Sequence, residues 1–119
     1  MGVEMAALDY EAAKARLGVS DDSMKMLLNH FAESFKDASK KLQQSISEND
    51  AQSAADQAHS LKGVAGSLEL LEIQNLAIEI EDKLKNDNIT GAAESCIILD
   101  EKIQQAILEI GQIVSGSDS

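Results

Sequence analysis

The sequence has few of the residues that build disulfide-linked or zinc-bound folds. Its 119 residues include no Pro, no Trp, one Cys and two His. A disulfide needs a second cysteine, and a structural zinc ion normally takes four Cys or His ligands, so the composition argues against both. A lone Cys is typical of proteins from the reducing cytoplasm, and we expect the protein to act there.

Long apolar runs and a surplus of positive charge are also missing. No stretch reaches the roughly 18 apolar residues of a membrane span, and the first residues lack the pattern of a signal peptide, so we expect no direct membrane contact. Ten Lys and Arg stand against 21 Asp and Glu, which gives a net charge of -11. This charge repels phosphate backbones, and it argues against a general nucleic-acid partner.

The residues that are abundant favour helix along the whole chain. Ala, Leu, Glu, Lys and Gln are frequent, and the apolar residues recur at three- and four-residue spacing. Gly18 fits the end of a short first helix, Ser20 or Asp21 the start of the second, and Asn49 or Asp50 the cap of the third. We expect helices and no strand, over residues 10–17, 20–49, 51–70, 73–84 and 90–114.

Four long amphipathic helices joined by short connections predict an antiparallel bundle. Each apolar stripe must be buried against its neighbours, and short loops place successive helices side by side. We therefore expect an all-α, up-down four-helix bundle, with the short additional N-terminal helix covering one end. Residues 1–119 are expected to form a single, monomeric domain, in which residues 1–7 and 115–119 fray.

The third expected helix carries the candidate chemistry. At ~100° per residue, a helical wheel centred on Leu61 gives a buried face made of residues 54, 58, 61, 64, 65 and 68. His59 lies about 160° from Leu61 and therefore points outward. Lys62 follows one turn later. Three small residues surround the histidine, and helical glycine costs roughly 1 kcal/mol relative to alanine, which indicates a surface kept clear for a partner. These residues are Ala55, Gly63 and Gly66.

An exposed histidine beside a lysine suits phosphoryl transfer. Histidine is a covalent nucleophile, and the Lys62 ammonium is placed to neutralise an anionic group on the imidazole of His59. The chain has no glycine-rich phosphate loop of a nucleotide-binding protein. His30 has no basic or glycine neighbours, so we interpret it as structural or incidental.

Three apolar residues lie off the main stripes of their helices. They are Met26, Leu70 and Ile78. We expect some of them to form an exposed docking patch near His59, and the alternative is partial burial under the first helix.

Residues 58–68, AHSLKGVAGSL, resemble the His-x-Leu-Lys-Gly signature of histidine-containing phosphotransfer (HPt) domains. The resemblance continues through Leu71, Ala77 and Glu81 in the next helix, and the helix order matches the bundle of that family. One residue departs from the pattern: Glu69 stands where the family usually has Gly. The departure bears on the helix end or the local charge and leaves the His59 position intact.

The resemblance implies a phosphoryl carrier of two-component phosphorelays. His59 would accept a phosphoryl group on Nε2 from a receiver-domain aspartate and pass it to another, with Nδ1 oriented by a hydrogen bond. Lys62 would steady the phosphoryl oxygens, and Gly63 would leave room for the receiver. The implied partners are response-regulator receivers and a hybrid sensor histidine kinase; the module itself would hold no cofactor, because Mg²⁺ would belong to the receiver.

Two other interpretations stay open at this point. The first is an HPt-like module that docks a receiver or kinase without being phosphorylated, although such a module has no need of both His59 and Lys62. The second is a metal protein with its site in the bundle core, which requires inward-facing Glu-x-x-His pairs that the sequence does not contain.

Overall fold

The computed structural model describes residues 10–116, and within them the chain forms five helices and no strand. This confirms the all-α prediction. Of the residues expected to fray, 1–7 and 117–119 lie outside the described range, and residues 115 and 116 are the last two of the final helix. The helices are α1 (Tyr10–Leu17), α2 (Asp21–Ser47), α3 (Ala51–Ser67), α4 (Leu71–Lys85) and α5 (Ile89–Gly116).

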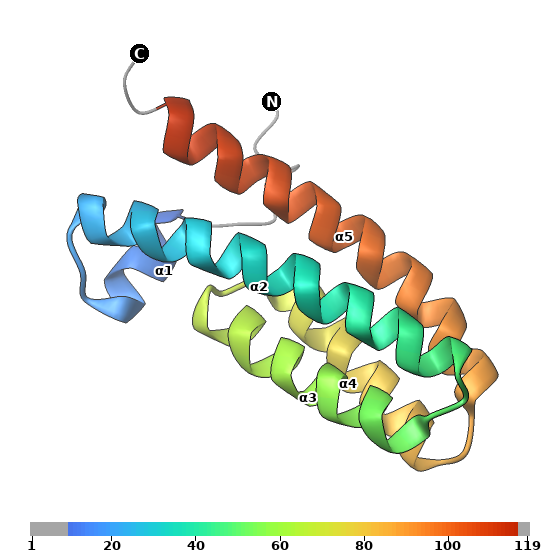
Figure 1. The fold of residues 1–119 in the computed structure, drawn as a ribbon. Coiled ribbons are helices and arrows are strands. Elements are labelled where there is room, and N and C mark those ends of the chain that lie inside the picture. Colours follow the sequence, from blue (N-terminus) through green and yellow to red (C-terminus); the bar gives the residue numbers. More distant parts are fainter. Residues whose placement is uncertain (1–9, 117–119) are drawn as a thin grey trace, which may run out of the picture.

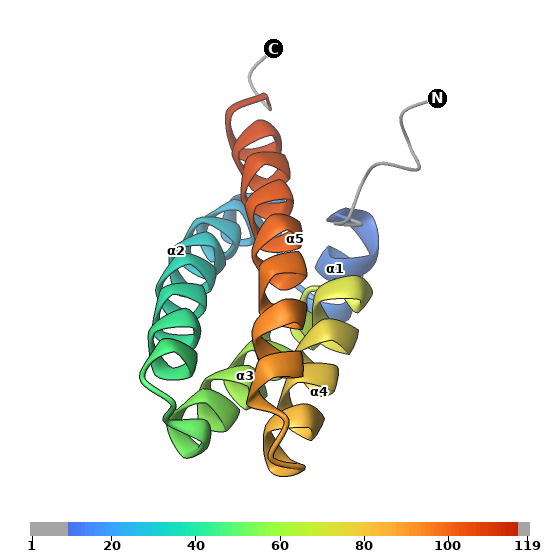
Figure 2. The same cartoon turned by 90° about the vertical axis from the view of Figure 1, so that its right-hand side faces the viewer.

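Helices α2 to α5 form the antiparallel four-helix bundle (Figure 1). Each helix packs on the next along the chain, and α5 closes the ring against α2. Helices α2 and α5 have 27 and 28 residues, against 17 and 15 for α3 and α4. The short α1 lies at the end of the bundle where α3 gives way to α4 (Figures 1 and 2), as expected for a helix that covers one end.

The helix starts follow from side-chain caps. Ser20 Oγ accepts a hydrogen bond from the backbone N–H of Ser23 at 3.2 Å at the start of α2. Asp50 Oδ1 does the same for Ser53 at 3.1 Å at the start of α3. Gly18, after α1, has a φ of 66°, a conformation that glycine adopts at little cost.

Helix α3 ends three residues earlier than the apolar spacing predicts. It stops at Ser67, and Glu69 then takes a φ of 60°. The backbone N–H of Leu70 turns back to the carbonyl of Ala65 at 2.9 Å, so the chain reverses over residues 68–70. The sequence places this break at residues 70–72 because both leucines around Glu69 continue the apolar pattern.

The core runs along the centre of the bundle. Five of the six residues of the predicted buried face are buried, which confirms the prediction for Ala54, Ala58, Leu61, Ala65 and Leu68. The sixth, Val64, is half-buried against the core. Cys96 is buried, and burial first, then the charge of Asp100, raises the pKa of its thiol to about 11. The largest fully buried side chains are Phe35, Met24, Leu28, Leu42, Leu61, Leu68, Leu70, Ile73, Ile80, Leu99, Ile103 and Ile110.

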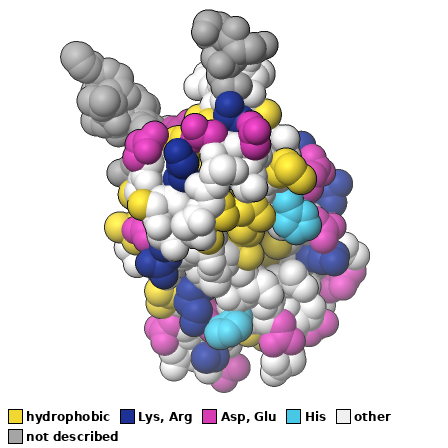
Figure 3. Space-filling view, turned by 90° about the vertical axis from the view of Figure 1, so that its left-hand side faces the viewer, with side chains coloured by type: hydrophobic (Ala, Val, Ile, Leu, Met, Phe, Trp, Pro, Cys, Tyr) yellow, Lys and Arg dark blue, Asp and Glu magenta, His cyan; other side chains and the backbone are white. Residues whose placement is uncertain are grey.

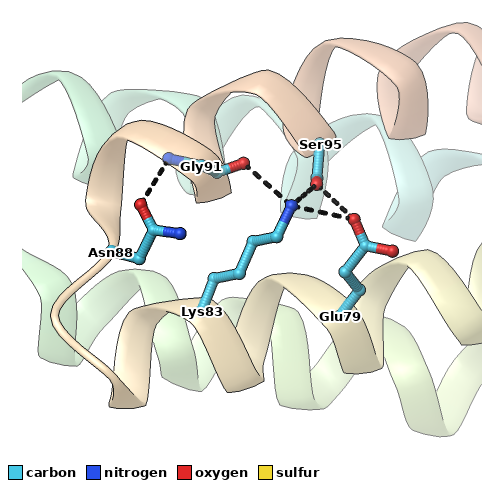
Figure 4. A network of polar contacts seen from close by, with 5 residues as sticks. All are labelled: Glu79, Lys83, Asn88, Gly91 and Ser95. Carbon is cyan, nitrogen blue, oxygen red and sulfur yellow. Dashed lines mark hydrogen bonds and ion pairs between the residues drawn. The ribbon is translucent and has the colours of Figure 1, made fainter.

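A polar network joins α4 to α5 (Figure 4). The buried Ser95 hydroxyl donates to Glu79 Oε2 at 2.5 Å and accepts from Lys83 Nζ at 2.8 Å. Lys83 also reaches Glu79 at 3.0 Å and the carbonyl of Gly91 at 3.5 Å. Asn88 Oδ1 accepts from the N–H of Gly91 at 2.9 Å, which satisfies a free donor in the first turn of α5.

Across residues 10–116, none of the helices combines the length and the apolar character that crossing a membrane requires.

Candidate functional site

His59 lies on the outer face of α3, opposite the buried alanines and leucine. Its side chain is 66% exposed, so the predicted outward orientation is confirmed. Figure 3 shows one face of the molecule, on which two histidine side chains and an apolar area are exposed among charged side chains. The imidazole is therefore accessible to another macromolecule.

Three cationic or potentially cationic side chains lie around the carboxylate of Glu81 on α4. Its Oε2 lies 3.4 Å from Nδ1 of His59 and 3.3 Å from Nζ of Lys85, and its Oε1 lies 3.6 Å from Nζ of Lys62. The Glu81 side chain itself is only 13% exposed. Because Nδ1 faces α4, the opposite edge of the ring carries Nε2, the nitrogen that the family resemblance implies as the acceptor.

Two opposing effects act on the Glu81 carboxyl. Partial burial alone raises its pKa, because the carboxylate loses water. A hydrogen bond from Lys85 and the charges of Lys85, Lys62 and His59 outweigh that effect, so the net shift lowers the pKa below its ordinary value of 4.5. Glu81 is thus an anion at neutral pH, held close to the imidazole.

Of the three small residues expected to clear the surface, only Gly63 has open space around it. It is exposed, and a Cβ placed there would meet no atom within 4 Å. At Gly66 a Cβ would stand 2.8 Å from Nε2 of Gln74, so this glycine permits close contact between α3 and α4. Ala55 is half-buried and packs on the core. The structure thus gives Gly66 and Ala55 packing neighbours, and their role in partner access stays a prediction.

The expected docking patch is exposed at two of its three positions. Met26 is 73% exposed and Ile78 is 44% exposed. Leu70 is 1% exposed, so its place in an exposed patch is wrong. The reversal at residues 68–70 turns the Leu70 side chain into the core and leaves Leu71, at the first position of α4, exposed instead.

The departure at Glu69 has a structural counterpart. The residue adopts the left-handed φ of 60° that glycine takes most readily, at a strain of order 1 kcal/mol for other residues. Its carboxylate pairs with Arg16 of α1 at 3.1 Å. The side chain that glycine would lack thus links α1 to the turn between α3 and α4.

The sequence alone gives no role of its own to Glu81 or Lys85. Glu81 is part of the family resemblance only, and Lys85 lies just beyond the expected end of the fourth helix at residue 84. The available signal was their spacing, since a Glu four residues before a Lys on one helix forms an ion pair. Over residues 10–116, no three His, Cys, Asp or Glu side chains come together in a way that would hold a metal ion.

The fold and the site together define a class of protein, a helical bundle that exposes a histidine on its third helix. Comparison with known proteins then gives the family. Residues 26–109 match the Hpt domain family, so the chain belongs to it. The HPt domain of an Hpt sensor hybrid histidine kinase from Shewanella matches with a TM-score of 0.81 and 18% identity, over 92% of this chain and 95% of that one. At this identity the match shows a shared fold. No curated protein sequence matches the chain.

Membership of this family establishes the general role. Hpt domains carry phosphoryl groups in two-component signalling, so the chain is a phosphotransfer module that works with response-regulator or kinase partners.

Proposed function

We propose that His59 accepts a phosphoryl group on Nε2 from an aspartyl phosphate of one receiver domain and passes it to the aspartate of another. The observation that carries this proposal is the exposed imidazole with its Nδ1 edge turned to the Glu81 carboxylate at 3.4 Å. An acidic neighbour at Nδ1 favours the tautomer that keeps the proton there and leaves the Nε2 lone pair free.

The transfer step needs no reactant other than His59 and the aspartyl phosphate of the receiver. The Nε2 lone pair of His59 attacks phosphorus, an N–P bond forms, and the O–P bond of the aspartyl phosphate breaks. The electron pair of that bond leaves with the aspartate as a carboxylate. The proton on Nδ1 stays in place, so the phosphorylated ring is an imidazolium whose positive charge faces Glu81.

Lys62 and Gly63 have supporting roles in this proposal. Lys62 neutralises the phosphoryl oxygens once they arrive, and its present contact with Glu81, at 3.6 Å, is the longest of the three around that carboxylate. Gly63 leaves open space one turn after His59, into which the receiver surface can approach. Met26 and Ile78 provide exposed apolar area for docking.

We further propose that the module is a carrier and not a complete enzyme, that it acts as a monomer, and that it works in the cytoplasm. It contributes a positioned nucleophile, while Mg²⁺ and the acidic pocket belong to the receiver. The buried thiol of Cys96 is compatible with a reducing compartment.

The test is incubation with a ³²P-phosphorylated receiver. We expect label on the wild type that is acid-labile and base-stable, and none on His59→Gln. The matched control is His30→Gln, which removes the other exposed histidine and should be labelled at the wild-type rate. Label on His59→Gln would overturn the assignment, and a wild type that binds receivers from a broad panel but takes label from none would favour the docking-only interpretation.

Lys62→Ala tests the supporting lysine. We expect transfer to slow by about tenfold, because a charge-assisted contact to the phosphoryl group is worth roughly 1.5 kcal/mol. Stability should change by less than about 0.5 kcal/mol, since the Lys62 ion pair is long and partly exposed. Single-turnover rates and urea unfolding measure the two effects, and equal losses in both would contradict this placement.

A further inference from the structure

The three partners of Glu81 do not all contact the same carboxylate oxygen. His59 Nδ1 and Lys85 Nζ both approach Oε2, at 3.4 and 3.3 Å, whereas Lys62 Nζ approaches Oε1 at 3.6 Å. Lys62 therefore uses an oxygen of its own. It can leave the carboxylate without breaking either of the other two contacts.

Phosphorylation changes the charges around this carboxylate. A phosphoryl group brings a charge of about -1.5 to -2 next to an existing carboxylate anion. When Lys62 moves toward the phosphoryl oxygens, Glu81 loses one of its two lysines. Repulsion from the phosphoryl group would then push the carboxylate away from Nδ1 unless a second cation held it.

Lys85 is placed to be that second cation. It lies four residues after Glu81 in the last turn of α4, where the spacing favours an ion pair and the helix end favours positive charge. Its side chain is 66% exposed, so the contact depends on this local geometry. Lys83, the other lysine in this part of α4, is engaged with Glu79 and with Ser95 of α5, so it does not compete with Lys85 for Glu81.

We propose that Lys85 is a positioning residue for phosphoryl transfer, which keeps the Glu81 carboxylate beside Nδ1 of His59 while Lys62 is released. The inference rests on the proposed role of His59 and assigns Lys85 an indirect action. Lys85 acts on the imidazole through Glu81 and need not touch either the phosphoryl group or the receiver.

The test compares Lys85→Gln with Lys41→Gln in single-turnover transfer from a phosphorylated receiver. Lys41 is the matched control because it also forms an i,i+4 ion pair, with Asp37 at 3.0 Å, and has a similar exposure on α2. Loss of an exposed ion pair predicts a rate roughly threefold lower for Lys85→Gln. Lys41→Gln should keep the wild-type rate, and Lys85→Arg, which retains the charge, should restore it.

A double-mutant cycle tests whether the effect passes through Glu81. In a Glu81→Gln background, Lys85→Gln should cause no further loss. If the threefold loss persists there, Lys85 acts by direct contact with the receiver and the proposal is overturned. A Lys85→Gln rate equal to that of the wild type also overturns it.

The ring tautomer of His59 provides a readout that needs no receiver. Long-range ¹H–¹⁵N correlation spectra report which imidazole nitrogen carries the proton. We expect the Nδ1–H form to lose population in Lys85→Gln and more so in Glu81→Gln, but not in Lys41→Gln. Failure of the wild type to take label would reject the role of His59, whereas unchanged spectra in Lys85→Gln would reject the positioning role alone.

Discussion

Two carboxylates on α4, only two residues apart, belong to networks of different character. Glu79 turns toward α5, where it meets Ser95 at 2.5 Å, and it also contacts Lys83 of its own helix at 3.0 Å (Figure 4). Glu81 turns toward α3, where it lies 3.4 Å from His59 and 3.6 Å from Lys62, and it also contacts Lys85 of its own helix at 3.3 Å. Each glutamate is followed four residues later by a lysine, so the local pattern along the helix is the same.

The partner helix makes the difference between them. Glu79 is 49% exposed, yet its contacts are short, because a buried neutral hydroxyl on α5 fixes their geometry. Glu81 is the more buried of the two but has longer contacts, all with charged or chargeable groups. Short hydrogen bonds stabilise one arrangement, whereas longer ion pairs can be exchanged. We therefore expect the contacts of α4 with α5 to stabilise the fold, and those of α4 with α3 to act in the proposed phosphoryl transfer.

Exchanging each carboxylate for an amide should separate the two roles. For Glu81→Gln we expect about tenfold slower transfer, because the imidazolium formed on phosphorylation loses its counter-charge, with little change in stability. For Glu79→Gln we expect normal transfer and a loss of about 1 kcal/mol in the free energy of unfolding, because the amide is a weaker acceptor for Ser95 and Lys83. Single-turnover transfer and urea unfolding of both variants measure this, and the same pattern in both would refute the division.

The architecture could be predicted from the sequence because helical periodicity reports burial directly. The wheel placed Leu61 inside and His59 outside, and both are so. The end of α3 was misplaced, because Leu68 and Leu70 extend the apolar spacing across a reversal that depends on the backbone conformation of Glu69. A side chain that occupies a glycine-like conformation leaves no trace in hydrophobic periodicity.

The site was only partly predictable for a related reason. His59 and Lys62 lie on one helix, where spacing fixes their relative positions. Glu81 and Lys85 come from another helix, and the rotation of α4 against α3 decides whether Glu79 or Glu81 meets the histidine. Both glutamates satisfy the same i,i+4 rule, so helical spacing cannot choose between them, and only the family resemblance singles out Glu81. Packing makes that choice.

Two glycines on α3 allow the same comparison within one helix. Gly63→Ala adds a methyl group in open space, so we expect a gain of about 1 kcal/mol in stability from helix propensity. The same methyl group should slow transfer, since it occupies the space proposed for the receiver. Gly66→Ala brings its Cβ to 2.8 Å from Gln74 Nε2, so this side chain must move and the gain should be smaller, with transfer unchanged.

Urea unfolding and single-turnover transfer measure both glycine variants. A Gly63→Ala protein that is more stable and transfers at the wild-type rate would show that the receiver does not approach this surface. Slower transfer in Gly66→Ala alone would place the approach nearer to α4.

The smallest expected effects are those of pH and salt on stability. The pKa of Glu79 is lowered from 4.5 by hydrogen bonds from Ser95 and then Lys83, and that of Glu81 is lowered by the lysines despite burial. A carboxyl whose pKa is lower in the folded state stabilises the fold above its ordinary pKa, and this contribution disappears as the pH falls through the folded value. Wild-type stability should therefore fall more steeply below about pH 4.5 than that of either Gln variant, by less than about 1 kcal/mol.

Salt should then distinguish the two networks at neutral pH. Ion pairs between partly exposed groups are screened at a Debye length of about 3 Å in 1 M salt, whereas short hydrogen bonds to a buried hydroxyl are affected much less. The stability difference between wild type and Glu81→Gln should shrink in 1 M NaCl, while the difference for Glu79→Gln should persist. Urea titrations at low and high salt measure both differences, and equal salt sensitivity would mean that the two carboxylates are held by the same kind of interaction.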